Sequence, residues 1–174
     1  GVVDAGVDRV DAGGGAGGTD VPQINGCLNT NWMIAANTLC TTSQACAGIP
    51  ASDKDPHYAI DGDIVTRYTS GVQQGSPAQD ETVTLTFPRT VTISGIRLRT
   101  TKPGDGVAIY RLEYSTNATT FMGFPTAVTG PGADDLTIPF PATAMRAIRI
   151  VQIGATSLAW WSIHELTVLG CVNS

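Results

Sequence analysis

The sequence predicts an all-β fold, an antiparallel sandwich or barrel, and three observations lead to it. From Thr82 onward, apolar residues recur at every second position in short runs, as expected for side chains that alternate between the two faces of a sheet. Turns rich in glycine and proline separate these runs, for example KPGDG and TGPGADD. No stretch sustains the 3.6-residue period of an amphipathic helix. Short strands at this spacing are typical of sandwiches and barrels.

The expected strands follow one another through the second half of the chain. The first covers residues 82–87, where Val83, Leu85 and Phe87 share one face, and Pro88 predicts a break after it. Further strands are expected at residues 91–100, 107–115, 135–140, 145–153 and 160–170. Residues 33–39 fit either a helical turn or an early strand, and the sequence does not decide between the two.

Residues 1–26 differ from the rest of the chain and are expected to form a Gly/Asp-rich tail or linker. VDAG occurs at residues 3–6 and again at 10–13, and GGGAGGTD follows. A segment without aromatic residues or a hydrophobic period is expected to be a flexible tether. The alternative is that its valines dock on a neighbouring subunit, as an added strand does. The folded domain is expected to span residues 27–174.

Composition and charge argue against several classes of function. The chain has 174 residues, of which 42% are hydrophobic, and this is enough for one domain with a substantial core. Its apolar runs are far shorter than a membrane-spanning helix requires, so we expect no membrane insertion. The net charge is −5 and there is no polybasic run. Nucleic acid is therefore not expected as a partner, because its binding needs a basic face.

The chain contains four cysteines, which are Cys27, Cys40, Cys46 and Cys171. They form no C-x-x-C pair and only two histidines accompany them, so a zinc site of ordinary spacing is not expected. Two disulfides are the better interpretation, with three possible pairings. We favour Cys27–Cys171 with Cys40–Cys46, because the outer pair lies at the two ends of the folded region. Disulfides require an oxidising compartment, which favours a secreted or cell-surface protein.

The segment YAIDGDIVTRYTSG, residues 58–71, is the most informative for chemistry. A hard cation such as calcium takes six to eight oxygens from carboxylates, carbonyls and hydroxyls. Asp61 offers a carboxylate and Gly62 permits a sharp turn beside it, while Asp63 and Thr66 follow where a curled loop can present further oxygens. Taken alone, D-G-D is more often a simple turn.

Several motifs together resemble a known family. A-x-D-G-D-x-x-T-R-Y-x-S at residues 59–70 and S-I-x-E-L-x-V-x-G at 162–170 resemble the discoidin domain, also called the coagulation factor five/eight type C domain. VTISGIRLR at 91–99, the run from Tyr110 to Ser115 and AIRI at 147–150 match further landmarks in the same order. The resemblance covers about residues 27–171.

The resemblance implies a galactose-binding-like jelly-roll sandwich of about eight strands, with a structural calcium in its first loop. By position it implies these calcium ligands: the carbonyl oxygens of Tyr58, Asp63 and His164, the carboxylates of Asp61 and Glu165, and both oxygens of Thr66.

Three positions depart from the family's pattern. Tyr68 replaces a tryptophan, and Phe87–Pro88 stands in place of an acidic residue, leucine and glycine. STNATTF at 115–121 replaces S-x-D-G-x-x-W, so this turn is expected to be built differently.

The resemblance also implies that ligands bind at the loops near the calcium, where an aromatic ring stacks on a sugar and polar side chains bind its hydroxyls. The candidates here are His57, Lys102, Asp105 and Trp160. Alternation along the last strand predicts that Trp161 points inward with Ile163 while Trp160 points outward. Each candidate has a structural alternative as a core or turn residue, and Trp32 is expected in the core or against a disulfide.

Nothing in the sequence indicates catalysis. There is no G-x-S-x-G elbow, the cysteines are expected to be paired, and Asp134 and Asp135 fall in a Gly/Pro turn. The sequence therefore favours a non-catalytic extracellular binding module whose partner is a glycan or cell-surface polysaccharide. The alternative is a self-assembling subunit of an extracellular filament or coat, a homo-oligomer built through the N-terminal tail. A lipid- or protein-binding module would show apolar or basic loop tips, and the loops here are rich in Gly and Asp.

Overall fold

The computed structural model describes residues 27, 32–36, 52–74, 81–124, 129–131, 133–153 and 160–173. These residues form antiparallel strands and two short 3-10 helices, so the all-β sandwich expected from the sequence is confirmed. The elements are β1 (Met33–Ala36), η2 (Ser52–Lys54), η3 (Pro56–Ala59), β2 (Tyr68–Gln73), β3 (Glu81–Arg99), β4 (Ile109–Ser115), β5 (Met122–Gly123), β6 (Thr129–Pro131), β7 (Asp135–Gln152), β8 (Trp160–Ile163), β9 (Glu165–Leu169) and β10 (Val172–Asn173). No helix in the described part of the chain has the length and apolar character needed to cross a membrane.

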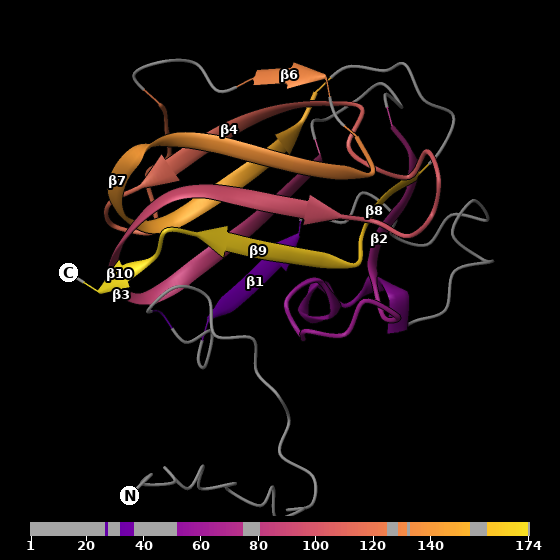
Figure 1. Cartoon of the computed structure of the whole chain (residues 1–174), viewed down its shortest axis with the longest axis horizontal. Helices are drawn as coiled ribbons and strands as arrows, with labels where there is room; N and C mark the ends of the chain where they lie inside the picture. The colour runs from indigo at the N-terminus through magenta and orange to yellow at the C-terminus, as the bar shows by residue number, and fades with distance from the viewer. Residues whose placement is uncertain are drawn as a thin grey trace, which may run out of the picture.

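Two long strands, β3 and β7, form the centre of the sandwich. They pair antiparallel from Glu81 opposite Gln152 to Arg99 opposite Asp135. The register shifts twice along the way, between residues 86 and 91 and between residues 93 and 95 of β3. Such bulges bend a strand, and Figure 1 shows both strands curling around one edge of the molecule. Each long strand thus contributes its two halves to the two layers.

The remaining strands extend these two layers. The first half of β3 pairs with β1 and with the second half of β7, which in turn pairs with β4. The second half of β3 pairs with β9 and with the first half of β7. The short strands β5 and β6 pair with β4, and β10 pairs with β3. A separate pair, β2 and β8, lies at the end of the sandwich that also carries the 3-10 helices (Figure 1).

The core lies between the layers and follows the expected alternation. Val83, Leu85 and Phe87 on β3 have no exposed surface, as the period-two pattern predicts. Trp32 packs edge-on against Phe87 with 5.1 Å between ring centroids, which confirms its predicted place in the core. Trp161 is also confirmed as inward-facing, with 1% of its surface exposed. Burial of each such side chain stabilises the fold by roughly 1.5–3 kcal/mol.

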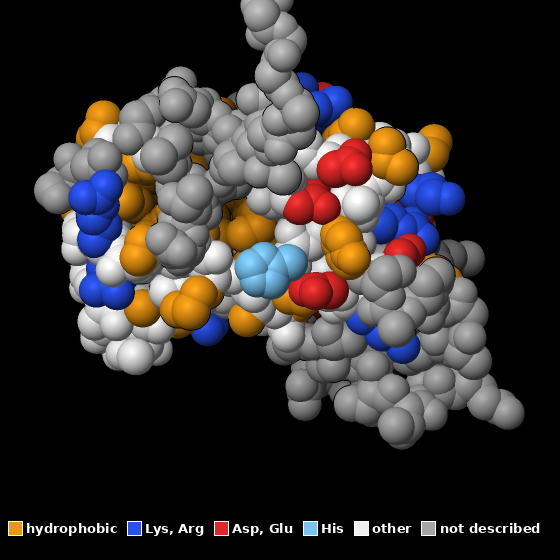
Figure 2. Space-filling model, turned by 90° about the horizontal axis from the view of Figure 1, so that it is seen from below, with side chains coloured by type: hydrophobic (Ala, Val, Ile, Leu, Met, Phe, Trp, Pro, Cys, Tyr) orange, Lys and Arg blue, Asp and Glu red, His pale blue; other side chains and the backbone are white. Residues whose placement is uncertain are grey.

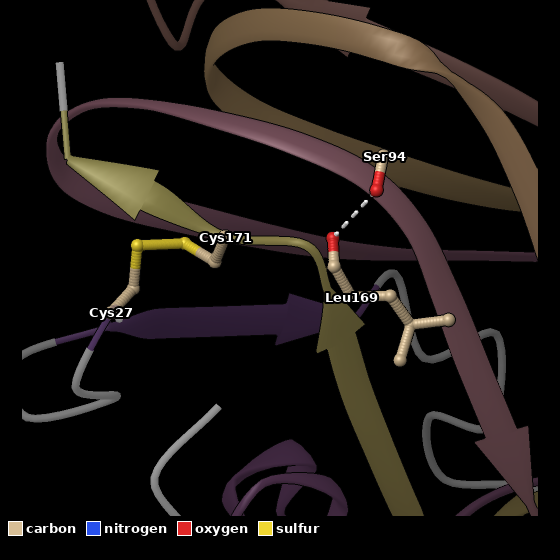
Figure 3. The surroundings of a disulfide bond; sticks show 4 residues. All are labelled: Cys27, Ser94, Leu169 and Cys171. Carbon is tan, nitrogen blue, oxygen red and sulfur yellow. Dashed lines mark hydrogen bonds between the residues drawn. A yellow bond between two sulfur atoms is a disulfide. The ribbon is translucent and has the colours of Figure 1, made fainter. Parts of the chain in front are cut away.

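A disulfide joins the two ends of the domain. Cys27 is bonded to Cys171 across a sequence separation of 144, with 5.6 Å between their Cα atoms, as expected from the sequence (Figure 3). Both cysteines are buried against the core. The predicted partners Cys40 and Cys46 lie outside the described residues, as does the predicted tail at residues 1–26.

The structure revises two expectations about the strands and decides a third question that the sequence left open. The predicted break at Pro88 is wrong, because β3 continues through this residue and only its register with β7 shifts. Asp135 begins β7 and pairs with Arg97, so it does not lie in a turn. Residues 33–36 form strand β1, which settles the choice between a helical turn and a strand in this segment.

The turn at residues 115–121 also differs from the expectation. Oδ1 of Asn117 accepts hydrogen bonds from the backbone N–H groups of Thr119 and Thr120, at 2.9 and 2.8 Å. Ala118 adopts a φ of 63°, in the left-handed region that glycine favours. Asn117 and Ala118 thus do what Asp and Gly do physically in such turns, namely accept local N–H groups and take positive φ. The replacement of Asp and Gly does not require a different turn.

Candidate functional site

The loop that follows η3 is folded tightly by its own side chains. Oδ1 of Asp61 accepts the backbone N–H of Asp63 at 2.9 Å, and Oδ1 of Asp63 accepts that of Val65 at 2.9 Å. Gly62 between the two aspartates has a φ of 81°, which a side chain would make costly. The D-G-D spacing thus produces two consecutive Asx turns, which curl the loop toward its own centre.

Oxygen atoms crowd the centre of this loop. Oγ1 of Thr66 lies 2.6 Å from Oδ2 of Asp61 and 2.9 Å from the carbonyl oxygen of Asp63. A threonine hydroxyl has one proton to donate, so it cannot serve both acceptors fully. The carbonyl oxygen of Asp63 also accepts the backbone N–H of Thr66 at 3.2 Å. A hydroxyl, a carboxylate and a carbonyl therefore meet at one place. Oxygens of these three kinds are the ligands of hard cations.

Glu165, the first residue of β9, reaches the same loop. Its Oε2 accepts the backbone N–H of Gly62 at 3.1 Å. Burial, followed by the charge of nearby Asp61, raises the pKa of Glu165 to about 7. The hydrogen bond from Gly62 acts against this rise but does not offset it. Two carboxylates that repel each other at a partly buried place are a donor set whose charge a divalent cation would neutralise.

The structure brings four of the six predicted calcium ligands together, which are Asp61, Asp63, Thr66 and Glu165. Tyr58 lies in η3, where its N–H donates to the carbonyl of Asp55 at 3.2 Å. His164 directly precedes Glu165 and is buried. Its ring Nδ1 lies 3.0 Å from Oγ1 of Thr100, in the neighbouring loop. Burial, and then the nearby cations Arg67 and Lys102, lower the pKa of His164.

The donors in this loop suit calcium better than zinc. Among the described residues, no group of three or more His, Cys, Asp or Glu side chains is placed to hold a metal ion. Zinc sites are built from such side chains, whereas calcium accepts carbonyl and hydroxyl oxygens beside two carboxylates. The residues present therefore fit the cation that the sequence predicts, and calcium binding stays a prediction.

A second loop, residues 100–107, lies at the same end and is held from three sides. Oδ1 of Asp134 accepts the backbone N–H groups of Gly104 and Gly106 at 3.1 and 3.0 Å. The carbonyl of Asp105 accepts the N–H of Ser162 at 2.8 Å. Nε2 of Gln74 donates to the carbonyl of Gly106 at 2.8 Å. These bonds fix the backbone while Lys102, on the outer part of the loop, stays exposed.

Asp105, one of the predicted ligand-binding residues, is engaged in contacts within the protein. Its Oδ2 accepts the hydroxyl of Ser162 at 3.0 Å and lies 3.5 Å from Nη1 of Arg67. The same arginine pairs with Asp53 of η2, with 3.0 Å between Nε and Oδ2. This network joins η2, the residue that precedes β2, and β8 to the second loop. It gives Asp105 a role in positioning, and direct ligand contact by Asp105 stays a prediction.

The other predicted ligand-binding residues lie around this end at different depths. Trp160 is partly exposed at the start of β8, and its carbonyl accepts Nε2 of Gln74 at 3.3 Å. His57 is exposed on η3, where the side chain of Asp55 accepts its backbone N–H at 2.9 Å. Figure 2 shows the face that carries the 3-10 helices, on which a histidine side chain lies among acidic and apolar side chains.

Sequence reasoning did not identify the residues that hold this end together, namely Asp53, Arg67, Gln74, Asp134 and Ser162. Arg67 belongs to the T-R-Y part of the first motif, so a signal for it was present. Asp134 and Gln74 act through backbone groups far away in sequence. No local pattern marks such contacts.

Comparison with known families identifies the domain. The model of the F5/8 type C domain matches residues 41–166, which is well over half of the chain. The chain belongs to the F5/8 type C domain family. This confirms the resemblance drawn from the two motifs and the strands between them. A comparison with curated protein sequences finds no match.

Solved structures show the same fold. The family 32 carbohydrate-binding module of NanJ from Clostridium perfringens, in complex with galactose, has a TM-score of 0.61 at 19% identity, covering 80% of this chain and 94% of that one. Chitosan-binding module 2 of a Paenibacillus chitosanase/glucanase, in complex with chitotriose, has a TM-score of 0.56 at 23% identity, covering 84% and 98%. The C-terminal domain of a chitobiase from Bacteroides fragilis has a TM-score of 0.62 at 25% identity, covering 83% and 97%.

Proposed function

We propose that this F5/8 type C domain is a non-catalytic, calcium-stabilised carbohydrate-binding module that acts outside the cell. The observation that carries the proposal is the partly exposed Trp160 at the same end of the sandwich as a loop whose backbone is fixed and whose Lys102 is exposed. A rigid aromatic ring beside a few polar groups is the usual composition of a small-ligand site.

Each candidate residue has a distinct part in this proposal. The ring of Trp160 packs on the apolar C–H face of a sugar, while Lys102 and His57 offer donors to its hydroxyls. Asp105 holds the second loop against Ser162 and Arg67, so the loop loses little freedom when a ligand binds. Solved relatives of similar fold are complexes with galactose and with chitotriose, which supports a glycan as the ligand class.

Calcium has a structural part in this proposal. Asp61 and Glu165 would hold the ion with their carboxylates, assisted by Thr66 and by carbonyl oxygens of the loop and of His164. The ion supplies positive charge that neutralises the two carboxylates. The protein supplies a loop already curled by its Asx turns and joined to β9 through Gly62 and Glu165. The result would be a fixed position for the face that carries His57.

The non-catalytic part of the proposal is supported by the state of the titratable groups. The ring of His164 contacts Thr100 and Thr101 and is buried, which leaves no access for a substrate. Asp134 is engaged by two backbone N–H groups, and Asp135 pairs with Arg97. A general acid or base must instead reach the proton that it transfers.

The test is glycan binding by the wild type and by two matched aromatic variants. The wild type should bind a member of a panel containing galactose, N-acetylgalactosamine and chitotriose, measured by titration calorimetry with calcium present. Trp160→Ala should lose about five- to tenfold in affinity, because a stacked ring contributes about 1–1.4 kcal/mol. Phe121→Ala is the control, since Phe121 lies beyond the far end of β4 beneath Arg149.

The possible outcomes test the proposed glycan binding and the assignment of Trp160 separately. Wild-type protein that binds no glycan of a broad array would overturn the proposed function. Equal affinity of Trp160→Ala and the wild type would overturn the assignment of Trp160 to the site. Loss of affinity in Phe121→Ala as well would show that the Trp160 effect is not local.

A further inference from the structure

Three buried polar side chains form a row across the inner face of the sandwich. Glu81 of β3 lies opposite Gln152 of β7, which in turn lies opposite Tyr110 of β4. All three are buried, with 4%, 3% and 8% of their surface exposed. Because side chains alternate along a strand, Glu81 lies on the same face as Val83 and the rest of the core. The carboxyl group of Glu81 therefore lies at the edge of the apolar core.

The carboxyl group of Glu81 lacks the partners that a buried charge needs. Among the described residues, neither of its oxygens has a hydrogen-bond partner of ordinary geometry. Burial raises the pKa of Glu81 to about 7, although the hydroxyl of Ser70 acts in the opposite direction. No charged group of the described residues contributes to this shift. A buried, unpaired carboxylate is costly, so the folded state favours the neutral acid.

Glu81 is adjacent to the strand pair that carries the candidate ligand site. Ser70, which acts on Glu81, lies on β2, and its Oγ accepts the backbone N–H of Trp161 on β8 at 3.3 Å. Trp160 is the neighbour of Trp161 and pairs with Gln73 of β2. The carboxyl group thus faces a hydroxyl that fixes the start of β8.

We propose that Glu81 is a proton switch for this end of the sandwich: the neutral acid lets β2 and β8 close over the core, and ionisation loosens them. An ionised Glu81 must draw in water or move toward water, because a buried carboxylate without partners is costly. Ser70 is the hydroxyl next to it on β2. Water entry at this place weakens the bond from Trp161 to Ser70. The effect on strand pairing stands by itself, whereas an effect on glycan affinity rests on the proposed function.

Among the described residues packed around Glu81, no other group titrates between about pH 4.5 and about pH 7. From β7 and β4 it is faced by Gln152 and Tyr110, and burial raises the pKa of Tyr110, so this phenol stays neutral. From β2 it meets the uncharged Ser70. Asp105, which pairs with Arg67, accepts the hydroxyl of Ser162, and this hydroxyl also bonds to Thr69. By alternation, Thr69 and Ser162 occupy the opposite face of the β2–β8 pair from Ser70 and Trp161.

The sign of the pH dependence follows from the raised pKa. Below the unfolded-state value of 4.5, both states are protonated and the group has no effect on stability. As the pH rises from 4.5 to about 7, the unfolded chain ionises freely while the folded protein resists. Stability is therefore lost across this window and stays low above it. Glu81→Gln keeps the shape of the side chain and removes the titration.

The experiment measures Tm and the hydrogen-exchange protection factor of the Trp161 amide between about pH 5 and about pH 8. We expect the wild type to lose several degrees of Tm and about tenfold in protection over this range, and Glu81→Gln to lose neither. Glu113→Gln is the matched control, because Glu113 makes ion pairs with Arg111 and Arg149, so it should follow the wild type. A Glu165→Gln background for every protein in the series, measured in chelator, removes the titration of Glu165 from the signal.

Ser70→Ala provides a second readout that does not depend on the folding of Glu81→Gln. It should abolish the pH dependence of Trp161 protection while the pH dependence of Tm persists. Glu81→Gln protein that follows the wild type in both measurements would overturn the switch. Glycan binding that depends on Trp160 but has the same pH profile in Glu81→Gln would overturn only the coupling to the ligand. If no glycan binds, Tm and exchange still test the switch.

Discussion

The backbone N–H of Gly62 donates to Oε2 of Glu165 across 3.1 Å, which joins two residues 103 positions apart in the chain. The contact places the carboxylate at the start of β9 against the loop that follows η3, beside Asp61. Without a cation, this arrangement carries a cost in repulsion and burial, seen in the raised pKa of Glu165. A cation bound here, as proposed, would neutralise both carboxylates and hold the loop against β9.

Glu165→Gln should therefore change stability in opposite directions with and without calcium. In chelator, the variant should have a higher Tm than the wild type, because it removes a partly buried carboxylate that Asp61 repels. In millimolar calcium the order should reverse, because the variant has lost a ligand of the ion. Thermal unfolding of both proteins with and without calcium measures this. A wild-type Tm that chelation leaves unchanged would contradict the calcium site.

Ala118→Gly should stabilise the domain. Ala118 has a φ of 63°, where an L residue with a Cβ is strained by roughly 1–2 kcal/mol. Glycine removes that strain but loses about 0.5–1 kcal/mol through the greater freedom of the unfolded chain. The net gain should be about 0.5–1 kcal/mol, visible as a rise of a few degrees in Tm.

Ala142→Gly is the control for this substitution. Ala142 is exposed in β7 and does not have positive φ. Its replacement should therefore leave stability unchanged or lower it. A gain in Tm at both positions would show that strain at Ala118 is not the cause.

The sequence predicted the strands well where burial is one-sided. Val83, Leu85 and Phe87 alternate with threonines, and this pattern allows one register of burial. It did not predict that β3 runs through Pro88, because a proline at a register shift need not donate a ladder hydrogen bond. Periodicity reports which face is buried, and it does not report where one strand passes from layer to layer.

The candidate site was predictable where residues act within one motif. Asp61, Asp63 and Thr66 fall in one loop, so their spacing was readable, and the family's register supplied Glu165. The contacts of Asp105 with Arg67 and Ser162 depend on the fold, because they join three segments. The same holds for Glu81, whose burial results from its pairing with Gln152 and not from any local pattern.

Gly170→Ala should destabilise the domain more than Gly104→Ala does. Both glycines have positive φ, 61° and 83°, so both substitutions carry the backbone cost of roughly 1–2 kcal/mol. A Cβ at Gly104 meets no atom within 4 Å, whereas one at Gly170 would overlap Oγ of Ser94. Figure 3 shows this hydroxyl directed at the carbonyl of Leu169, 3.5 Å away.

The excess cost at Gly170 should be recovered in part by removing the hydroxyl. The loss of stability in the double variant Gly170→Ala/Ser94→Ala, relative to Ser94→Ala, should approach the loss in Gly104→Ala relative to the wild type. Urea unfolding of the wild type and these variants measures both differences. If Ser94→Ala gives no recovery, the overlap with its Oγ is not the source of the excess.

Asp134→Ala should weaken both the domain and its binding of glycan. Oδ1 of Asp134 accepts the N–H groups of Gly104 and Gly106, so its removal leaves two donors without their partner at a loss of roughly 2 kcal/mol. The loop that carries Lys102 then gains freedom, which ligand binding must remove again. Asp135→Ala is the control, because Asp135 is exposed and its ion pair with Arg97 contributes little. Calorimetric titration should show lower affinity in Asp134→Ala alone, whereas equal affinity in both variants would mean that the loop's rigidity does not matter for binding.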